Sequence, residues 1–312
     1  GIDDAMALLS LRAAQGVRLH SLTTVFGNAD VRTTSRNAAF LAARFGLDLP
    51  ICVGAAEPLE GRRHVPALKV HGPDGLGGTG LAQGVPVPQS AVSAWQHIAD
   101  TISAYPGEVS LLAIGPLTNL ALALRHRPQI AADVHEVVVM GGAFGTRGRY
   151  GNIRPHAEAN FFYDPLAAEE VLAAPWPVTV VGLDVSADCI LSSAEAAAMA
   201  THLGETGELL WAISRDYAEI YRKFDGVDGL CIHDVAAAAR LVSPELFSVR
   251  RAAIGVRTDG EDAGRSFLSP DARRPVQGFC DHVEADRLIS QFIEILTTFA
   301  TPDAPSGRIE TA

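Results

Sequence analysis

The chain has 312 residues, and its 36 acidic against 25 basic side chains give a formal net charge of −11. An acidic surface repels phosphate backbones, so the charge argues against nucleic-acid binding. No apolar stretch approaches the ~20 residues that a helix needs to span a bilayer, whereas 48% hydrophobic residues suffice for a large core. The composition therefore indicates a globular protein whose partners are neither nucleic acids nor membranes.

The four cysteines, Cys52, Cys189, Cys231 and Cys280, are widely separated. This favours buried thiols in a reducing compartment over disulfides or a zinc site. The sequence shows no charged and then apolar leader, so we expect a cytoplasmic protein. Because it begins at Gly1 rather than at a methionine, we also expect the natural amino terminus to lie upstream of Gly1.

Apolar β-branched runs alternate with Ala-rich amphipathic stretches through the first part of the chain. We predict helices, in chain order, at residues 3–14, 32–45, 91–104, 119–125 and 165–173. The strands predicted between and after them cover residues 19–25, 51–53, 109–114, 137–140 and 178–183. Near-continuous apolar strands that are separated by helices are typical of a mostly parallel sheet with helices on both faces.

The second part of the chain is expected to be mainly helical. Helices are predicted at residues 194–200, 206–224, 233–241 and 282–299, and a strand at residues 248–256. Residues 301–312 are polar, contain Pro and Gly, and are expected to form a flexible tail. Because no linker, charge block or repeat divides the sequence, we predict one large α/β domain of Rossmann type over residues 1–312. In such open sheets the ligand binds beyond the carboxyl ends of the strands.

Two adjacent carboxylates open the first predicted helix, in the segment Gly1–Asp4. Neighbouring side chains on a helix project ~100° apart, so one of Asp3 and Asp4 can bind a cation while the other binds a ligand. Alternatively, both acids only complement the positive end of the helix dipole. The start of the helix predicted at 233–241 offers a similar choice. There Asp234 is a metal ligand or a cap, and His233 is a general acid or a buried neutral imidazole.

Two predicted strands end in segments that suit a ligand. The first runs into Gly27 and Asn28, although a simple turn also explains this pair. The third ends at Ile114, whose main-chain carbonyl is available to an ion if Gly115 lets the backbone approach closely. An ordinary strand-to-helix turn, with Thr118 as the helix cap, is the alternative.

Two further segments carry polar side chains. Residues 57–89 form a long irregular stretch in which His71 precedes several glycines, so the stretch is a binding loop or a hinge. Beyond Met140, Glu158 and Asn160 lie two positions apart, and in an extended chain they point the same way. A carboxylate beside an amide suits the hydroxyl groups of a sugar. The alternative is a surface loop that caps the next helix.

In this order, the segments resemble the inosine-uridine preferring nucleoside hydrolase family, and the resemblance spans the chain from Gly1 to the last predicted helix. The family signature opens with Asp-x-Asp-x-Gly-x-Asp-Asp, whose second half matches residues 1–4. The other matches are 25–28 (Val-Phe-Gly-Asn), 71–72 (His-Gly), 115–119 (Gly-Pro-Leu-Thr-Asn), 140–142 (Met-Gly-Gly), 158–160 (Glu-Ala-Asn) and 233–234 (His-Asp). The resemblance implies hydrolysis of the N-glycosidic bond of ribonucleosides to ribose and free base, using a Ca²⁺-bound water.

The resemblance also implies roles for individual residues, carried over position by position. The Ca²⁺ ligands would be Asp4, Asp234 and the main-chain oxygen of Ile114. The residues that hold the ribose would be Asp3, Asn28, Met140, Asn152, Glu158 and Asn160. His71 would lie on the loop above the base, and His233 would protonate the base as it leaves. The family further implies a homodimer or homotetramer, and nucleoside salvage in the cytoplasm.

The sequence departs from the family in two places. The first two aspartates of the signature, including the general base, would precede Gly1, together with the first strand that carries them. Ala159 stands between Glu158 and Asn160 where some relatives carry Phe, so base preference stays open. Two other functions stay open as well: a non-catalytic nucleoside or ribose binder on the same scaffold, and an unrelated dinucleotide-using enzyme. The absence of a Gly-x-Gly-x-x-Gly after a strand argues against the last.

Overall fold

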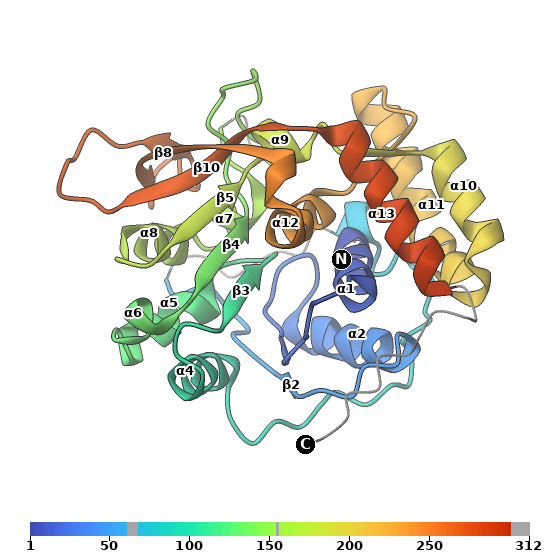
Figure 1. Cartoon of the computed structure of the whole chain (residues 1–312), viewed down its shortest axis with the longest axis horizontal. Helices are drawn as coiled ribbons and strands as arrows, with labels where there is room; N and C mark the ends of the chain where they lie inside the picture. The colour runs from blue at the N-terminus through green and yellow to red at the C-terminus, as the bar shows by residue number, and fades with distance from the viewer. Residues whose placement is uncertain (61–67, 154–155, 301–312) are drawn as a thin grey trace.

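Figure 1 shows the protein as a computed structural model, which describes residues 1–60, 68–153 and 156–300. Its centre is a six-stranded sheet in the order β3-β4-β5-β10-β8-β9. The parallel strands are β3 (Ser110–Ala113), β4 (Glu136–Met140), β5 (Val178–Val181) and β10 (Val276–Val283). β8 (Phe247–Val256) runs antiparallel to both β10 and β9 (Ser266–Leu268). This mostly parallel sheet confirms the predicted fold class.

Helices cover both faces of the sheet, which therefore separates two hydrophobic cores (Figure 1). Side chains alternate between the faces of a strand, so in β4 Val137 and Val139 enter one core while Val138 and Met140 enter the other. The first core contains α4 (Ala94–Ala104), α5 (Thr118–His126), α6 (Ile130–Asp133) and α8 (Pro165–Ala173). The second contains α1 (Ile2–Ala13), α10 (Ser193–His202), α11 (Gly204–Asp225), α12 (His233–Val242) and α13 (Ala285–Ala300).

Shorter elements complete the fold. β6 (Ile190–Ser192) pairs antiparallel with β7 (Gly229–Cys231). The short helices are α3 (Leu68–His71), α7 (Ala159–Tyr163), α9 (Leu183–Ser186) and a 3₁₀ turn at Pro244–Leu246. All four cysteines are buried and free, as predicted. Among the helices of the described residues, none combines the length and the apolar character that crossing a membrane requires.

A separate parallel pair of strands lies beside the main sheet. It consists of β1 (Leu22–Thr23) and β2 (Ile51–Cys52), and α2 (Val31–Arg44) packs beside β2. Asn119 of α5 bridges the pair to the main sheet, because its Nδ2 donates to the Thr24 carbonyl at 2.8 Å and its Oδ1 accepts from the Ala55 N–H at 3.0 Å. Between β1 and β3 lies a groove of about 740 Å³. In the described part of the chain, β1 pairs only with β2 and β3 only with β4, so each strand has one unpaired edge.

The structure corrects several details of the prediction. The run at residues 19–25 forms only the two-residue strand β1, because no strand pairs with its second edge. Four strands of the described residues were not predicted, the three-residue strands β6, β7 and β9 and the eight-residue strand β10. β10 includes His282, which had been assigned to the last helix. Thr118 begins α5 rather than capping it, and its hydroxyl donates to Asp164 at 2.6 Å. The tail at 301–312 lies outside the described residues, and the single-domain organisation stays a prediction.

Candidate active site

An acidic cluster forms where two helices begin. Asp3 and Asp4 lie in the first turn of α1, and Asp234 lies in the first turn of α12, which packs against α1. One carboxylate oxygen of each residue lies within 4.8 Å of the other two. The backbone N–H of Asp234 also contacts Asp3 Oδ2 at 3.4 Å, although the residues are 231 positions apart. Asp4 and Asp234, predicted to meet at one ion, are therefore neighbours.

Burial and mutual repulsion disfavour the ionised forms of the carboxylates in this cluster, which a bound cation would stabilise. Burial, reinforced by the charge of Asp4, raises the pKa of Asp3 to about 7. Burial and the charges of Asp3 and Asp4 raise the pKa of Asp234 well above its usual value. Asp4 Oδ2 lies 2.8 Å from the backbone nitrogen of Gly1. Buried carboxylates with raised pKa values are stabilised in their ionised form by a divalent cation, and Ca²⁺ prefers such oxygen ligands.

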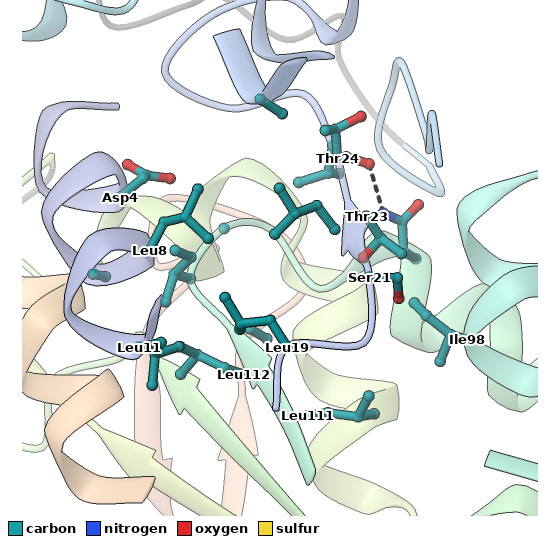
Figure 2. Close-up of a pocket in the computed structure, with 18 of the residues that line it drawn as sticks. Asp4, Leu8, Leu11, Leu19, Ser21, Thr23, Thr24, Ile98, Leu111 and Leu112 are labelled. Carbon is teal, nitrogen blue, oxygen red and sulfur yellow. Dashed lines mark hydrogen bonds between the residues drawn. The ribbon is translucent and has the colours of Figure 1, made fainter. Parts of the chain in front are cut away.

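Of the acidic cluster, Asp4 lines the groove between β1 and β3 (Figure 2). Asp4 faces the groove from α1, and further along the walls are apolar, with leucines contributed by α1, by the approach to β1 and by β3. Three other predicted site residues line the same cavity, namely Asn28, Ile114 and Asn160. The lining of this one cavity thus includes residues predicted to bind the metal and residues predicted to bind the ribose.

Gly1 brings three predicted side chains to one point. A Cβ atom at Gly1 would lie 2.5 Å from Asp4 Oδ2, 2.6 Å from Asn28 Nδ2 and 3.0 Å from His71 Nδ1, so a larger residue there would have to displace these side chains. His71 is buried, and its ring centre lies 5.2 Å from that of Tyr217. Burial lowers the pKa of His71 below its usual value. At neutral pH this imidazole is uncharged, and among the described residues its Nδ1 has no hydrogen-bond partner.

Glu158 organises the segment that was predicted to hold a sugar. It caps α7, and its Oε1 accepts from the N–H of Asn160 at 2.9 Å. The extended arrangement predicted for this pair is therefore wrong, because the cap turns the chain into a helix at Ala159. Asn160 Nδ2 instead donates to the Met140 carbonyl at 3.1 Å. The alternative, a surface loop that caps the next helix, holds only in part, because Glu158 caps α7 but is buried.

Asn152 supports the same segment, because its Oδ1 accepts from the Ala159 N–H at 3.0 Å. The second oxygen of Glu158 accepts from the Gly142 N–H at 3.0 Å, just beyond β4. Burial raises the pKa of Glu158 to about 7. Four of the residues predicted around a ribose, Met140, Asn152, Glu158 and Asn160, thus belong to one hydrogen-bonded unit, in which Asn152 and Glu158 hold backbone groups in place. Asp3 and Asn28 lie outside this unit.

His233 is held at both ring nitrogens. Its Nδ1 lies 2.9 Å from Ser186 Oγ, and its Nε2 lies 3.0 Å from the Tyr221 hydroxyl. That hydroxyl lies 3.1 Å from the hydroxyl of Tyr217. Burial, with a smaller effect of the positive charge of Arg149, lowers the pKa of His233 to about 4, so the ring is neutral at pH 7. A continuous line of hydrogen bonds therefore runs from Ser186 to Tyr217, beside His71.

The sequence analysis missed Tyr217, Tyr221 and Ser186. The two tyrosines lie four positions apart on α11, hence on one face of the helix, and this spacing was the available signal. Ser186 lies on the short helix α9, and nothing in the local sequence distinguishes it from other buried serines.

One short turn after β5 contacts both sides of the site. Asp184 is fully buried and accepts the N–H groups of Phe144 at 2.7 Å and Thr146 at 2.8 Å, which lie in the loop after β4. Two residues further on, Ser186 holds the imidazole of His233. The turn therefore connects the loop that leads to the sugar segment with the hydrogen bonds around the histidine.

Comparison with known proteins now identifies the family. The model of the family described as inosine-uridine preferring nucleoside hydrolase matches residues 1–290, almost the whole chain. The chain belongs to this family. The resemblance predicted from the sequence is thereby confirmed, together with the enzyme class, an N-glycosyl hydrolase of ribonucleosides.

Relatives of this nucleoside hydrolase share both its sequence and its fold. Uridine nucleosidase 1 of Arabidopsis thaliana is 36% identical over 278 residues, which cover 88% of this chain and 81% of that protein. The non-specific ribonucleoside hydrolase RihC of Salmonella schwarzengrund is 36% identical over 274 residues, covering 88% and 86%. The solved structure of the plant nucleoside hydrolase PpNRh1 matches with a TM-score of 0.89 at 30% identity, covering 95% of this chain and 96% of that one.

Proposed function

We propose that this nucleoside hydrolase cleaves ribonucleosides at the acidic cluster, with Ca²⁺ held by Asp4, Asp234 and the main-chain oxygen of Ile114. The observation that carries the proposal is the approach of three carboxylates, those of Asp3, Asp4 and Asp234, to within 4.8 Å of one another. When bound, Ca²⁺ supplies positive charge that orients hydroxyl groups and lowers the pKa of a water molecule. The names of the uridine-cleaving and non-specific relatives support the substrate class.

The ribose would lie where the groove meets the acidic cluster. Asp3 offers a carboxylate to its hydroxyl groups, and Asn28 and Asn160 offer amides from the cavity wall. The remaining proposed ribose contacts are Met140, Asn152 and Glu158. Cleavage of the glycosidic bond builds positive charge on the sugar ring, and the surrounding carboxylates stabilise that charge.

The base would lie between His71 and the tyrosines of α11. A nucleobase leaves poorly as an anion, so a proton delivered during cleavage speeds the reaction. Because Ser186 and Tyr221 occupy both nitrogens of His233, we infer that the imidazole does not touch the base directly. The proton reaches the base from a tyrosine hydroxyl, and the hydroxyl is reprotonated along the line of hydrogen bonds from His233. The neutral His233 ring takes up a proton from solvent as it passes one on, so the net transfer is one proton from solvent to the base and the ring ends neutral.

We further propose that an extended segment upstream of Gly1 fills the groove between β1 and β3. Gly1 lines the groove at the start of α1, so such a segment would lead directly into the helix. Its backbone would pair with the unpaired edges of β1 and β3, and its apolar side chains would cover the leucines of the walls. Its end would lie at the acidic cluster, where the resemblance implies the remaining aspartates, including the general base.

Release of ribose by the full-length protein tests the proposed activity. We expect free ribose from uridine or inosine in the presence of Ca²⁺. The release should stop when EGTA removes the ion and resume when Ca²⁺ is added in excess. Calorimetric binding of both nucleosides without any release of ribose would instead identify a non-catalytic binder and would contradict the proposal.

Substitutions along the hydrogen-bond line should affect natural nucleosides more than activated ones. Tyr221→Phe removes the hydroxyl that contacts His233 Nε2, and we expect kcat for inosine to fall roughly 10²- to 10⁴-fold, as it should for His233→Ala. Nitrophenyl riboside, whose leaving group needs no proton, should be cleaved at nearly the unchanged rate. The exposed Tyr105→Phe serves as the matched control. Equal losses on both substrates would reject the proton route.

The family resemblance supports three broader proposals for this chain. We propose that it acts as a homodimer or homotetramer, that it is located in the cytoplasm, and that it serves nucleoside salvage. Light scattering of the purified full-length protein measures the first directly.

A further inference from the structure

We propose that Asp74 is a positioning residue that fixes His71 against the substrate site. The inference rests on the proposed function, in which His71 contacts the base. Asp74 lies three residues beyond His71, in the segment His71–Gly80 that joins α3 to the following irregular chain. The sequence left the stretch 57–89, to which this segment belongs, open as either a binding loop or a hinge, and the contacts of Asp74 argue against a hinge.

The carboxylate of Asp74 gathers three backbone N–H groups of its own loop. Its Oδ1 accepts from Leu76 at 2.9 Å and from Gly78 at 2.8 Å, and its Oδ2 accepts from Gly80 at 2.7 Å. Hydrogen bonds to an ionised acceptor are about twice as strong as neutral ones. One side chain therefore fixes the path of seven consecutive residues, 74–80, and this segment does not behave as a freely moving hinge.

The backbone of this loop is folded too tightly for ordinary side chains. Gly72 has a φ of +76°, and a Cβ there would lie 2.4 Å from the nitrogen of Gly78. Gly77 has a φ of +73°, and a Cβ there would lie 2.4 Å from the carbonyl oxygen of Ile213 on α11. The loop thus touches α11 one turn before Tyr217, whose ring stands beside that of His71.

Three contacts tie the loop to the protein and to His71. The Leu76 side chain is 1% exposed and belongs to the second core. Asn37 of α2 donates from its Nδ2 to the Asp74 carbonyl at 2.7 Å. The Gly77 N–H donates to the His71 carbonyl at 2.9 Å, which links the folded loop directly to the histidine. Loss of the Asp74 carboxylate would free the loop ends and release His71 from its place between Gly1 and Tyr217.

Chemical modification of His71 tests its position without any assay of activity. Diethyl pyrocarbonate acylates accessible imidazoles, and mass spectrometry resolves the rate for each histidine of the full-length protein. In the wild type, His71 should react far more slowly than the exposed His135 and His202. In Asp74→Ala, it should react at a rate close to theirs. Unchanged protection of His71 in a folded Asp74→Ala variant would overturn the proposal.

A control and a fallback keep this test interpretable. Thr79→Ala removes a different hydrogen bond of the same loop, from Thr79 Oγ1 to the Leu76 carbonyl at 3.0 Å, and should keep His71 protected. If circular dichroism shows that Asp74→Ala does not fold, Asp74→Asn, which keeps one acceptor oxygen, should give partial exposure of His71. Full protection in the asparagine variant would also contradict the proposal.

Kinetics then separate positioning from a general loss of stability. Asp74→Ala should lower kcat/KM about 10²-fold, the effect typical of a displaced contact. In a protein that already carries His71→Ala, adding Asp74→Ala should change kcat/KM very little, because Asp74 acts through the histidine. Independent losses that multiply would reject the positioning role. If His71→Ala itself leaves activity unchanged, the proposed base contact fails, while the modification rates still report on whether Asp74 fixes the ring.

Discussion

Replacing Asp234 by alanine in the full-length protein is expected to lower kcat/KM for nucleosides roughly 10³-fold. The variant loses one of the three converging carboxylates, and with it a ligand for the proposed Ca²⁺. A bound cation is worth several kcal/mol of transition-state stabilisation, and each ~1.4 kcal/mol corresponds to a tenfold change in rate. Steady-state kinetics over a Ca²⁺ titration measure the effect, and the concentration of Ca²⁺ for half-maximal activity should rise in parallel.

A comparison of stabilities distinguishes a lost metal ligand from a damaged fold. The exposed Asp48→Asn serves as the control and should behave like the wild type. In EGTA, the Asp234→Asn protein should melt no lower than the wild type, because the substitution removes a buried carboxyl group. Burial and the charges of Asp3 and Asp4 already disfavour ionisation of that group and raise its pKa. Added Ca²⁺ should raise the melting temperature of the wild type and of Asp48→Asn, but not that of Asp234→Asn. A variant that is strongly destabilised in EGTA would show that Asp234 has a structural role instead.

The buried carboxylates also predict how the stability of the metal-free protein changes with pH. In the 1–312 chain, burial and the charge of Asp4 raise the pKa of Asp3 to about 7, so below that pH the folded state binds more protons than the unfolded state. Without metal, this contribution to stability is present at low pH and is lost as the pH rises through about 7. Ca²⁺ should reduce this dependence, because a bound cation favours the ionised carboxylates.

Adding the segment proposed to lie upstream of Gly1 is expected to change both stability and activity. Burial of even two large apolar side chains in the groove is worth roughly 3–6 kcal/mol. For a chain of this size each kcal/mol shifts the melting temperature by about 2–4 °C, so a rise of about 10 °C is expected from the extension. Turnover of nucleosides should appear with the extension, because the proposed general base lies within it.

Two controls separate packing from chemistry in this experiment. An extension of equal length made of Gly and Ser should leave the melting temperature unchanged, because it cannot cover the leucines of the groove. The natural extension with its aspartates replaced by asparagine should restore the melting temperature but not the turnover. If the natural extension adds no stability, the groove between β1 and β3 is not its binding place.

The architecture could be predicted from the sequence because buried parallel strands leave a strong signal. β4 is apolar at every position from Val137 to Met140, since its two faces enter two different cores. The short strands β6, β7 and β9 escaped prediction because three residues are too few to show a period. β10 escaped because polar residues such as Asp281 and His282 interrupt its apolar pattern.

The site could be predicted only in part. Asp4 and Asp234 were found because each carboxylate opens a helix, and the family order suggested that they meet. The geometry of Glu158 was missed because a side chain that caps a helix and one that faces a sugar have the same sequence pattern. The partners of His233 were missed because a hydrogen bond between Ser186 and a residue 47 positions away leaves no local trace.

The turn after β5 couples the position of the loop after β4 to the position of the His233 ring. Asp184 anchors the loop after β4, and Ser186, on the same helical turn, anchors His233. A backbone shift in this turn would displace the sugar segment and the imidazole together, so their spacing is set by a single rigid part. Tyr217 and Tyr221, by contrast, come from α11, so their proposed contacts with the base can be altered on that helix while the spacing set by the turn is left intact.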